Sequence, residues 1–259
     1  MKRHLIQFAH SNGFPAKCFN CLFNSIESAD IHYVDLMGHN QFKLDENLEN
    51  LALELIDSIE KKYNEPIIGI GHSTGGVLML IAASLKPHLF KKIIVLEPIL
   101  YHPWKRRLIV IIKKIGLSSY IGPAKRTLKR KSVFRSRDEA KEYFESKSIF
   151  QGFHKNCLAD YIQYGFKKTE NGVELAFSKE IESAIYRSTY TKLPAGIEKL
   201  NGTIIYGSKS NMFRKSDAKW WKRKFPNFNM ITLDEGHLFP LEKPVQAAKI
   251  INHILKNSV

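Results

Sequence analysis

The sequence predicts an α/β fold in which a mostly parallel sheet of about six strands carries helices on both faces, with a largely helical segment inserted in it. Short β-branched runs alternate with helical periods, which is typical of a parallel sheet wrapped by helices. The alternation stops for about a hundred residues and then resumes. With 259 residues, 44% of them hydrophobic, the chain is long enough for one sizeable core.

The first part of the chain supplies four strands and three helices. Buried parallel strands appear as short apolar runs, whereas the second helix carries an apolar stripe formed by Leu48, Leu51, Leu55 and Ile59. We expect strands at residues 4–9, 31–36, 67–71 and 92–96, and helices at residues 16–26, 45–63 and from the third strand to Leu85.

The last part of the chain repeats the pattern, with strands expected at residues 203–206 and 229–233 and helices at 216–224 and 244–255. Residues 1–98 and 201–259 therefore form the predicted core, and residues 99–200 an inserted cap, or lid. A cap inserted at the strand ends lies over the site, covers the substrate and sets specificity.

Two local signals describe the cap. Ser136 and Glu139 have the spacing of a capping box that opens a helix through Phe144. Asn171 and Gly172 supply the positive φ that a tight hairpin turn needs. The cap is therefore expected to be mainly helical with one hairpin.

The run from Ile67 to Leu85 is the most informative stretch, because it places Ser73 in Gly71-His72-Ser73-Thr74-Gly75 between a strand and a helix. A Gly-x-Ser-x-Gly elbow exposes the serine hydroxyl on a strained turn, and small neighbours let strand and helix approach closely. A membrane span would also be free of charge, but would not carry these polar residues near its middle. Ser73 is therefore the predicted nucleophile.

A serine nucleophile needs a base to accept its proton and a carboxylate to orient that base. His237 follows the last strand and is the predicted base. The loop after residues 203–206 has no carboxylate before Asp217, so Glu97, directly after the strand at 92–96, is the predicted acid. Asp217 and Asp234 remain as alternatives.

The oxyanion formed during attack requires two backbone N–H groups. Thr74 is expected to supply one. The other should come from the loop after the first strand, with Asn12 preferred and Phe14 as its alternative. His10 and His72 are expected to brace loops through hydrogen bonds rather than to take part in proton transfer.

Together these motifs resemble the α/β-hydrolase superfamily over nearly the whole chain. The matching segments are His10-Ser11-Asn12-Gly13-Phe14-Pro15, Asp35-Leu36-Met37-Gly38-His39, the elbow, and the stretch from Gly236 to Pro244. Leu96-Glu97-Pro98 and the hairpin strand at residues 172–175 are further similar to a bacterial branch of serine hydrolases or esterases with no named substrate. The chain departs from the superfamily where Ser210 or Asn211 stands at the usual acid position, and it lacks the opening antiparallel hairpin. The resemblance implies that Glu97 takes the acid's place, as in haloalkane dehalogenase-like relatives, although Ser73 in place of Asp disfavours dehalogenation.

The sequence thus predicts a serine esterase, most simply a carboxylesterase with an acyl pocket under a basic cap. Thioesterase, lipase and carbon–carbon bond hydrolase use the same constellation, and a noncatalytic binding protein on the same fold is the alternative of another class. No cofactor and no metal are needed. Cys18 and Cys21 form a lone Cys-x-x-Cys pair and Cys157 is distant, which favours structural thiols over zinc or redox roles.

The net charge of +15 is concentrated in one part of the chain. Residues 104–137 hold twelve Lys and Arg and no Asp or Glu. We therefore expect a small-molecule ester as partner and no nucleic acid. Residues 104–117 are cationic and apolar, so either they pack on the acyl pocket, which we favour, or they make a weak contact with an anionic membrane surface; attraction of an acidic substrate is a third interpretation. The short apolar N-terminal run does not resemble a signal peptide, and a cytoplasmic location is expected.

Overall fold

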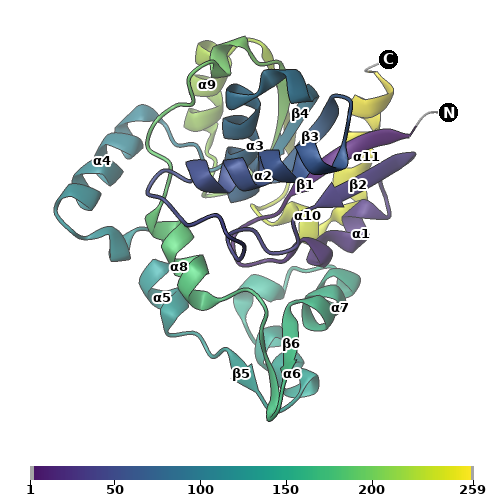
Figure 1. Ribbon diagram of the computed structural model, residues 1–259, viewed down its shortest axis with the longest axis vertical. Coiled ribbons are helices and arrows are strands. Elements are labelled where there is room, and N and C mark those ends of the chain that lie inside the picture. Colours follow the sequence, from purple (N-terminus) through teal and green to yellow (C-terminus); the bar gives the residue numbers. More distant parts are fainter. Residues whose placement is uncertain (1–2, 258–259) are drawn as a thin grey trace.

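The computed structural model describes residues 3–257 and contains a six-stranded sheet in the order β2-β1-β3-β4-β8-β9 (Figure 1). Every neighbouring pair in this sheet is parallel. Its strands are β1 (His4–Ala9), β2 (Ala29–Tyr33), β3 (Ile67–His72), β4 (Phe90–Leu96), β8 (Gly202–Gly207) and β9 (Phe228–Leu233). The predicted fold class is confirmed.

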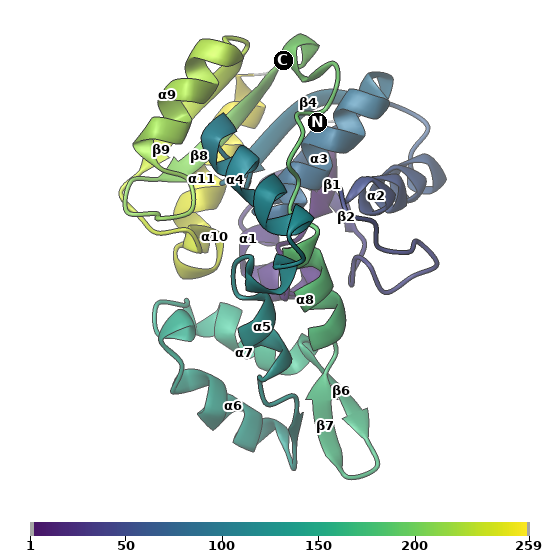
Figure 2. The ribbon, with the colours of Figure 1, turned by 90° about the vertical axis from the view of Figure 1, so that its left-hand side faces the viewer.

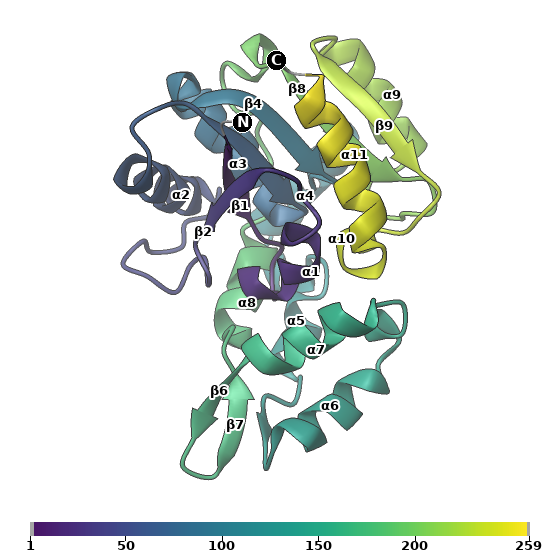
Figure 3. The same cartoon turned by 90° about the vertical axis from the view of Figure 1, so that its right-hand side faces the viewer.

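Helices cover both faces of the sheet, and each face has its own apolar cluster (Figure 3). The helices on one face are α2 (Glu49–Lys62), α3 (Thr74–Leu85) and α9 (Lys215–Lys224). Those on the other face are α1 (Asn20–Phe23), α10 (Phe239–Glu242) and α11 (Pro244–Lys256). None of the helices within residues 3–257 is long and apolar enough to cross a membrane.

Residues 99–200, which we call the intervening segment, connect β4 to β8 and lie largely outside the sheet (Figure 2). The segment is mainly helical, and it also forms a small antiparallel sheet in the order β5-β7-β6. Its elements are α4 (Pro103–Lys114), α5 (Ala124–Leu128), β5 (Val133–Phe134), α6 (Arg137–Glu145), α7 (Lys155–Tyr164), β6 (Phe166–Thr169), β7 (Gly172–Leu175) and α8 (Lys179–Arg187). Short 3-10 helices lie at Ala16–Phe19, Pro87–Leu89, Ser118–Tyr120, Ser148–Phe150 and Ile197–Lys199.

The intervening segment shares its core with the sheet. Ile185 of α8 belongs to the apolar cluster on the α3 face, and Phe144 of α6 belongs to the cluster on the α11 face. The predicted hairpin is formed by β6 and β7, with φ of 138° at Gly172. Ser136 caps α6 by accepting the N–H of Glu139 at 3.2 Å, but Glu139 Oε2 accepts the N–H of Arg135 at 2.7 Å, so only half of the predicted capping box forms. The third strand, β5, was not anticipated.

Several predicted boundaries are wrong, including the end of β2, which is Tyr33 rather than residue 36, and the start of β4, which is Phe90 rather than residue 92. The helix expected at residues 16–26 is a 3-10 turn followed by the four-residue α1, because Asn24 and Ser25 are poor helix formers and Ser25 Oγ donates to the carbonyl of Cys21. Strand β2 begins at Ala29 rather than at residue 31, paired with His4. Helix α2 begins at Glu49 because Leu48 has a left-handed φ of 60°.

The order of the strands indicates where a crevice lies at the edge of the sheet. The chain passes from β1 to β2 on one side and then returns to place β3 on the other side of β1. The loops that leave β1 and β3 therefore diverge at the carboxyl edge of the sheet, the position where ligands bind in open α/β sheets.

Candidate active site

Ser73 occupies a strained elbow between β3 and α3, with φ of 56° and ψ of −117°. The flanking glycines are required by close packing, because a Cβ on Gly71 would lie 2.4 Å from the carbonyl oxygen of Gly75. A Cβ on Gly75 would lie 2.1 Å from the carbonyl oxygen of Ala9 on β1. Strand and helix thus approach to within backbone contact, and the elbow presents a serine that is only 5% exposed.

The structure brings Ser73, His237 and Glu97 together in one hydrogen-bonded chain. His237 Nε2 lies 3.0 Å from Ser73 Oγ. His237 Nδ1 lies 2.5 Å from Glu97 Oε2. The three residues follow β3, β9 and β4 respectively, so three strands deliver them to the same edge of the sheet.

Glu97 is fully buried and its carboxylate is held by further donors. The backbone N–H of Gly207 donates to Oε1 at 2.6 Å, and Ser210 Oγ donates to Oε2 at 2.7 Å. The residue itself has a positive φ of 48°, which turns the chain away from β4. The carboxylate is therefore fixed from the sheet side and from the loop after β8.

Sequence reasoning did not anticipate the role of Ser210. Ser210 stands at the position where the superfamily usually carries its acid, and here its hydroxyl binds the acid that comes from the neighbouring strand. The signal was present in the sequence, because a hydroxyl at a site vacated by a carboxylate can donate to a carboxylate beside it.

Neither alternative acid contacts His237. Asp217 is buried at the start of α9, where it accepts the backbone N–H of Arg214 at 3.0 Å and lies 3.6 Å from Lys105 Nζ. Asp234 is exposed and pairs with Lys209 at 2.8 Å. Both carboxylates thus have structural partners elsewhere.

The loop after β1 reaches the elbow from the side of the intervening segment. Asn12 is buried, and its Nδ2 donates to the backbone carbonyl of Glu182 on α8 at 2.9 Å. The N–H of Phe14 donates to the carbonyl of Ser11 at 3.3 Å, which closes a turn. Since the N–H of Phe14 already has a partner in this turn, the geometry favours Asn12 over Phe14 as an oxyanion donor. Thr74 begins α3, where the first N–H groups of a helix lack partners within the helix.

His10 and His72 are buried braces, as predicted. His10 Nδ1 donates to the carbonyl of Ser11 at 2.9 Å and its Nε2 accepts the N–H of Met37 at 3.0 Å, which joins two loops. His72 Nε2 donates to the backbone carbonyl of His237 at 3.0 Å. Burial lowers the pKa of His10 to about 4, and burial together with nearby His237 lowers the pKa of His72 to about 3, so both rings are neutral at pH 7.

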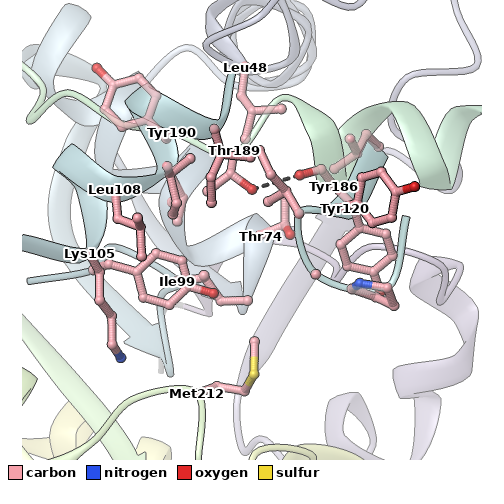
Figure 4. A pocket seen from close by; sticks show the side chains of 18 of the residues that line it. Leu48, Thr74, Ile99, Lys105, Leu108, Tyr120, Tyr186, Thr189, Tyr190 and Met212 are labelled. Atoms are coloured by element: carbon pink, nitrogen blue, oxygen red, sulfur yellow. Dashed lines mark hydrogen bonds between the residues drawn. The ribbon is translucent and has the colours of Figure 1, made fainter. Parts of the chain in front are cut away.

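An apolar cavity of about 340 Å³ begins beside the elbow and extends under α4 (Figure 4). Thr74 and Met212 line it from the core, and α4, Tyr120 and α8 line it from the intervening segment. Neither Ser73 nor His237 lines the cavity, which borders the elbow at Thr74. The cavity has the size and lining of a pocket for an acyl chain or another apolar group.

The thiols lie away from this site. Cys21, Cys157 and His154 offer ligand atoms within 4.8 Å of one another, a set that a soft metal ion could use. Burial raises the pKa of Cys157 far above its usual range, however, and this favours the protonated thiol in the cluster. Cys18 and Cys157 are members of the apolar cluster on the α11 face and Cys21 packs against it, so the three thiols share one surrounding.

Known proteins resemble this chain in sequence and in fold. The type I acyl-CoA thioesterase of Penicillium brevicompactum is 28% identical over 178 residues, which are 61% of this chain and 39% of that protein. The chain thus spans about two fifths of the length of this curated relative. The peroxisomal α/β-hydrolase of Saccharomyces cerevisiae superposes with a TM-score of 0.77 at 20% identity, over 98% of this chain and 76% of that one. The thioesterase domain from the curacin biosynthetic pathway gives a TM-score of 0.69 at 16% identity, over 96% and 90%.

The family assignment rests on the length of the match. The sequence pattern of the alpha/beta hydrolase family matches residues 8–250, which include the elbow, the strand end that carries Glu97 and the loop that carries His237. The fold and the order of the three site residues along the chain agree with this match. The chain belongs to the α/β-hydrolase family.

Proposed function

We propose that this protein is a serine hydrolase that cleaves carboxylic esters through an acyl-enzyme on Ser73. The observation that carries the proposal is the continuous hydrogen-bonded chain from Ser73 Oγ through His237 to the buried Glu97 carboxylate. A binding protein on this fold would need neither the strained elbow nor a buried carboxylate aligned with the imidazole.

In this proposal His237 acts first as base and then as acid. Its Nε2 takes the proton of Ser73 Oγ as the oxygen attacks the acyl carbon, and it returns that proton to the departing alcohol. Glu97 accepts the Nδ1–H bond, which keeps Nε2 free to act as base and stabilises the imidazolium that forms. Water then attacks the acyl carbon of the acyl-serine, with His237 Nε2 taking the proton of the water and giving it to Ser73 Oγ as the carboxylic acid leaves.

The backbone N–H groups of Thr74 and Asn12 would hold the oxyanion. Thr74 supplies the helix N-terminus, whose partial positive charge favours an anion. The side chain of Asn12 is anchored on Glu182, which fixes the loop that carries its N–H. The two donors thus come from the core but depend on a contact with the intervening segment.

The apolar cavity supports a substrate with an acyl chain. A carboxylic ester is the primary candidate, and a thioester is the second, because the sequence relative and one structural neighbour are thioesterases by name. Lipase and carbon–carbon bond hydrolase activities would use the same three residues, and the cavity by itself does not favour them.

The first experiment measures hydrolysis of p-nitrophenyl esters from acetyl to palmitoyl by the wild type and by Ser73→Ala. We expect serine-dependent turnover, with a chain-length optimum that reflects the cavity. A fluorophosphonate probe that labels Ser73, located by mass spectrometry, reports the activated serine independently of substrate choice. Turnover that persists in Ser73→Ala, or the absence of both turnover and labelling, would contradict the proposal and favour the noncatalytic binding protein.

A further inference from the structure

A second cavity, of about 550 Å³, lies on the other side of the oxyanion loop, and we call it the basic chamber. Its core side is formed by Gly13 and Phe14 and its remaining walls by the intervening segment. The walls are lined by Pro123, Arg126, Thr127, Lys129, Arg130, Tyr143, Phe144, Lys147, Ser148, Ile149, Phe150, Tyr161, Glu182 and Tyr186.

The chamber has an excess of positive charge. Its single carboxylate, Glu182, is buried and already paired with Arg130. The other three cations of the lining are Arg126, Lys129 and Lys147, and none of them forms an ion pair with a carboxylate of residues 3–257. Cations that face one cavity repel one another, and a bound anion would relieve this repulsion.

Aromatic rings form the rest of the wall. Phe14 packs near Phe150 with ring centroids 6.1 Å apart, and Lys147 lies 4.1 Å from the centroid of the Tyr143 ring. Cations beside aromatic faces suit a ligand that combines phosphate groups with a flat ring, because the cations meet the charge while the rings stack.

The basic chamber and the apolar cavity are neighbours. Pro123 and Tyr186 line both. Thr74, which follows the nucleophile, belongs to the apolar cavity, whereas Gly13 and Phe14 belong to the chamber. Thr74 thus borders the apolar cavity, and Gly13, which follows the other proposed donor, Asn12, borders the basic chamber.

We propose that the basic chamber binds a phosphate or diphosphate group carried by the alcohol or thiol portion of the substrate. The inference rests on the proposed serine hydrolase function and narrows it to acyl esters or thioesters of a phosphorylated alcohol or thiol. Ser73 Oγ bonds to the acyl carbon, and the bond from that carbon to the leaving oxygen or sulfur breaks. The leaving atom takes the proton from His237 Nε2, and water then releases the carboxylic acid from the serine.

A binding measurement tests the chamber without requiring turnover. Coenzyme A, which combines a thiol, phosphates and a flat ring, is titrated by calorimetry into the wild type and into Arg126→Gln/Lys129→Gln. We expect binding to weaken at least about tenfold in the variant, as for the loss of contacts to a charged group. The charge-matched control is Arg107→Gln/Lys114→Gln, which removes two cations of α4 that line neither the basic chamber nor the apolar cavity and should leave binding unchanged.

A kinetic comparison tests the proposal for the basic chamber separately from the proposal that the protein is a hydrolase. The wild type and both double variants are assayed with octanoyl-coenzyme A and with the neutral octanoyl-N-acetylcysteamine. We expect Arg126→Gln/Lys129→Gln to lower kcat/KM at least about tenfold for the phosphorylated thioester only. Ser73-dependent hydrolysis without coenzyme A binding would overturn the chamber and leave the hydrolase standing, whereas binding without any Ser73-dependent turnover would support the chamber and overturn the hydrolase. Binding to phosphatidylglycerol vesicles that is lost in Arg126→Gln/Lys129→Gln, without coenzyme A binding by the wild type, would assign these cations to a lipid surface and overturn the inference.

Discussion

The carboxyl edge of the sheet buries polar side chains, whereas helix α4 exposes apolar side chains. At the sheet edge Glu97 and His72 are buried, and Glu97 meets three donors. On α4 only Ile109 is buried, while Trp104 is 57% exposed and Ile111 56%, and Ile115 directly after the helix is 62% exposed. The α4 helix lines the apolar cavity with one edge and presents another apolar edge to solvent.

The two regions differ in how strongly packing and hydrogen bonding constrain their side chains. Buried polar groups tolerate few rearrangements, because each lost partner costs about 1–3 kcal/mol. Exposed apolar side chains on α4 carry no such constraint, since surface changes usually alter stability by about 0.5 kcal/mol or less. The hydrogen-bonded side chains at the sheet edge are therefore strongly constrained, while the exposed apolar side chains of α4 are free to vary.

The largest effect is expected from Glu97→Gln, which disturbs the hydrogen-bonded residues at the sheet edge. Replacing the carboxylate by an amide should misorient His237 and lower kcat by about a thousandfold with the fold retained. Steady-state kinetics and circular dichroism check this. The matched control is Asp217→Asn, which should lower the unfolding temperature through the loss of its contacts at α9 and leave kcat near the wild-type value. A fall in kcat for Asp217→Asn alone would move the acid role to Asp217.

The second largest effect is expected at low pH, where the buried histidines of the sheet edge should lower the free energy of unfolding. His10 and His72 have pKa values of about 4 and about 3 in the folded protein, because burial disfavours their charged forms. In the unfolded chain both titrate near pH 6.5, so below that pH the unfolded state binds more protons and the free energy of unfolding falls. Each histidine should contribute a loss of about 1.4 kcal/mol per pH unit between about pH 6 and pH 4.

Urea unfolding between pH 7.5 and pH 4.5 measures this slope. His10→Gln cannot titrate and should flatten it, whatever its effect on stability at pH 7.5. An identical slope in His10→Gln and wild type would show that His10 is charged in the folded protein or is not buried.

Two glycine variants, Gly13→Ala and Gly116→Ala, test whether the contact between the oxyanion loop and Glu182 affects kcat. Gly13 and Gly116 both have positive φ, 82° and 75°, so alanine strains the backbone at either position by about 1–2 kcal/mol. A Cβ on Gly13 would also lie 2.8 Å from the carboxyl carbon of Glu182, whereas a Cβ on Gly116 meets nothing within 4 Å. Gly13→Ala should therefore lower kcat by about tenfold or more, and Gly116→Ala should leave kcat unchanged. Equal kinetic effects would mean that the contact with Glu182 does not position the loop.

The smallest expected effect lies on α4. Wild-type protein should float weakly with phosphatidylglycerol vesicles, and Ile111→Ser/Ile115→Ser should reduce the bound fraction several-fold because apolar area is lost from a cationic helix. Leu85→Ser/Val245→Ser removes exposed apolar side chains elsewhere and is the control. The absence of flotation by the wild type at physiological salt would rule out the membrane contact and leave packing on the cavity as the role of α4.

Patterns local to the chain predicted most of the fold. Ser73 and Glu97 directly follow apolar runs and His237 follows one after three residues, so strand periodicity places them at one edge of a parallel sheet. The helix at residues 16–26 failed because one Asn-Ser pair ends α1 early, a weak signal within an apolar stretch. Strand boundaries shifted because pairing with β1, rather than hydrophobicity, decides where β2 begins.

Apart from those among Ser73, Glu97 and His237, most contacts between distant segments were not predicted. Ser210 binds Glu97 across 113 positions, and β5 adds a two-residue strand that has no pattern of its own. The basic chamber likewise assembles Phe14 with residues more than a hundred positions later. Strand β5 and the basic chamber depend on how the intervening segment folds back on the core, and sequence periodicity carries no information on that.

The hydrogen bond from Asn12 to the carbonyl of Glu182 joins residues 170 positions apart. It also limits how this enzyme scaffold can be re-engineered. Exchanging the whole intervening segment for that of a homologue, a common route to new specificity, would remove the support of the loop beside the nucleophile. A chimaera that keeps α8 and replaces only α4 to α6 would preserve this support. The part that can be exchanged is therefore smaller than the whole intervening segment.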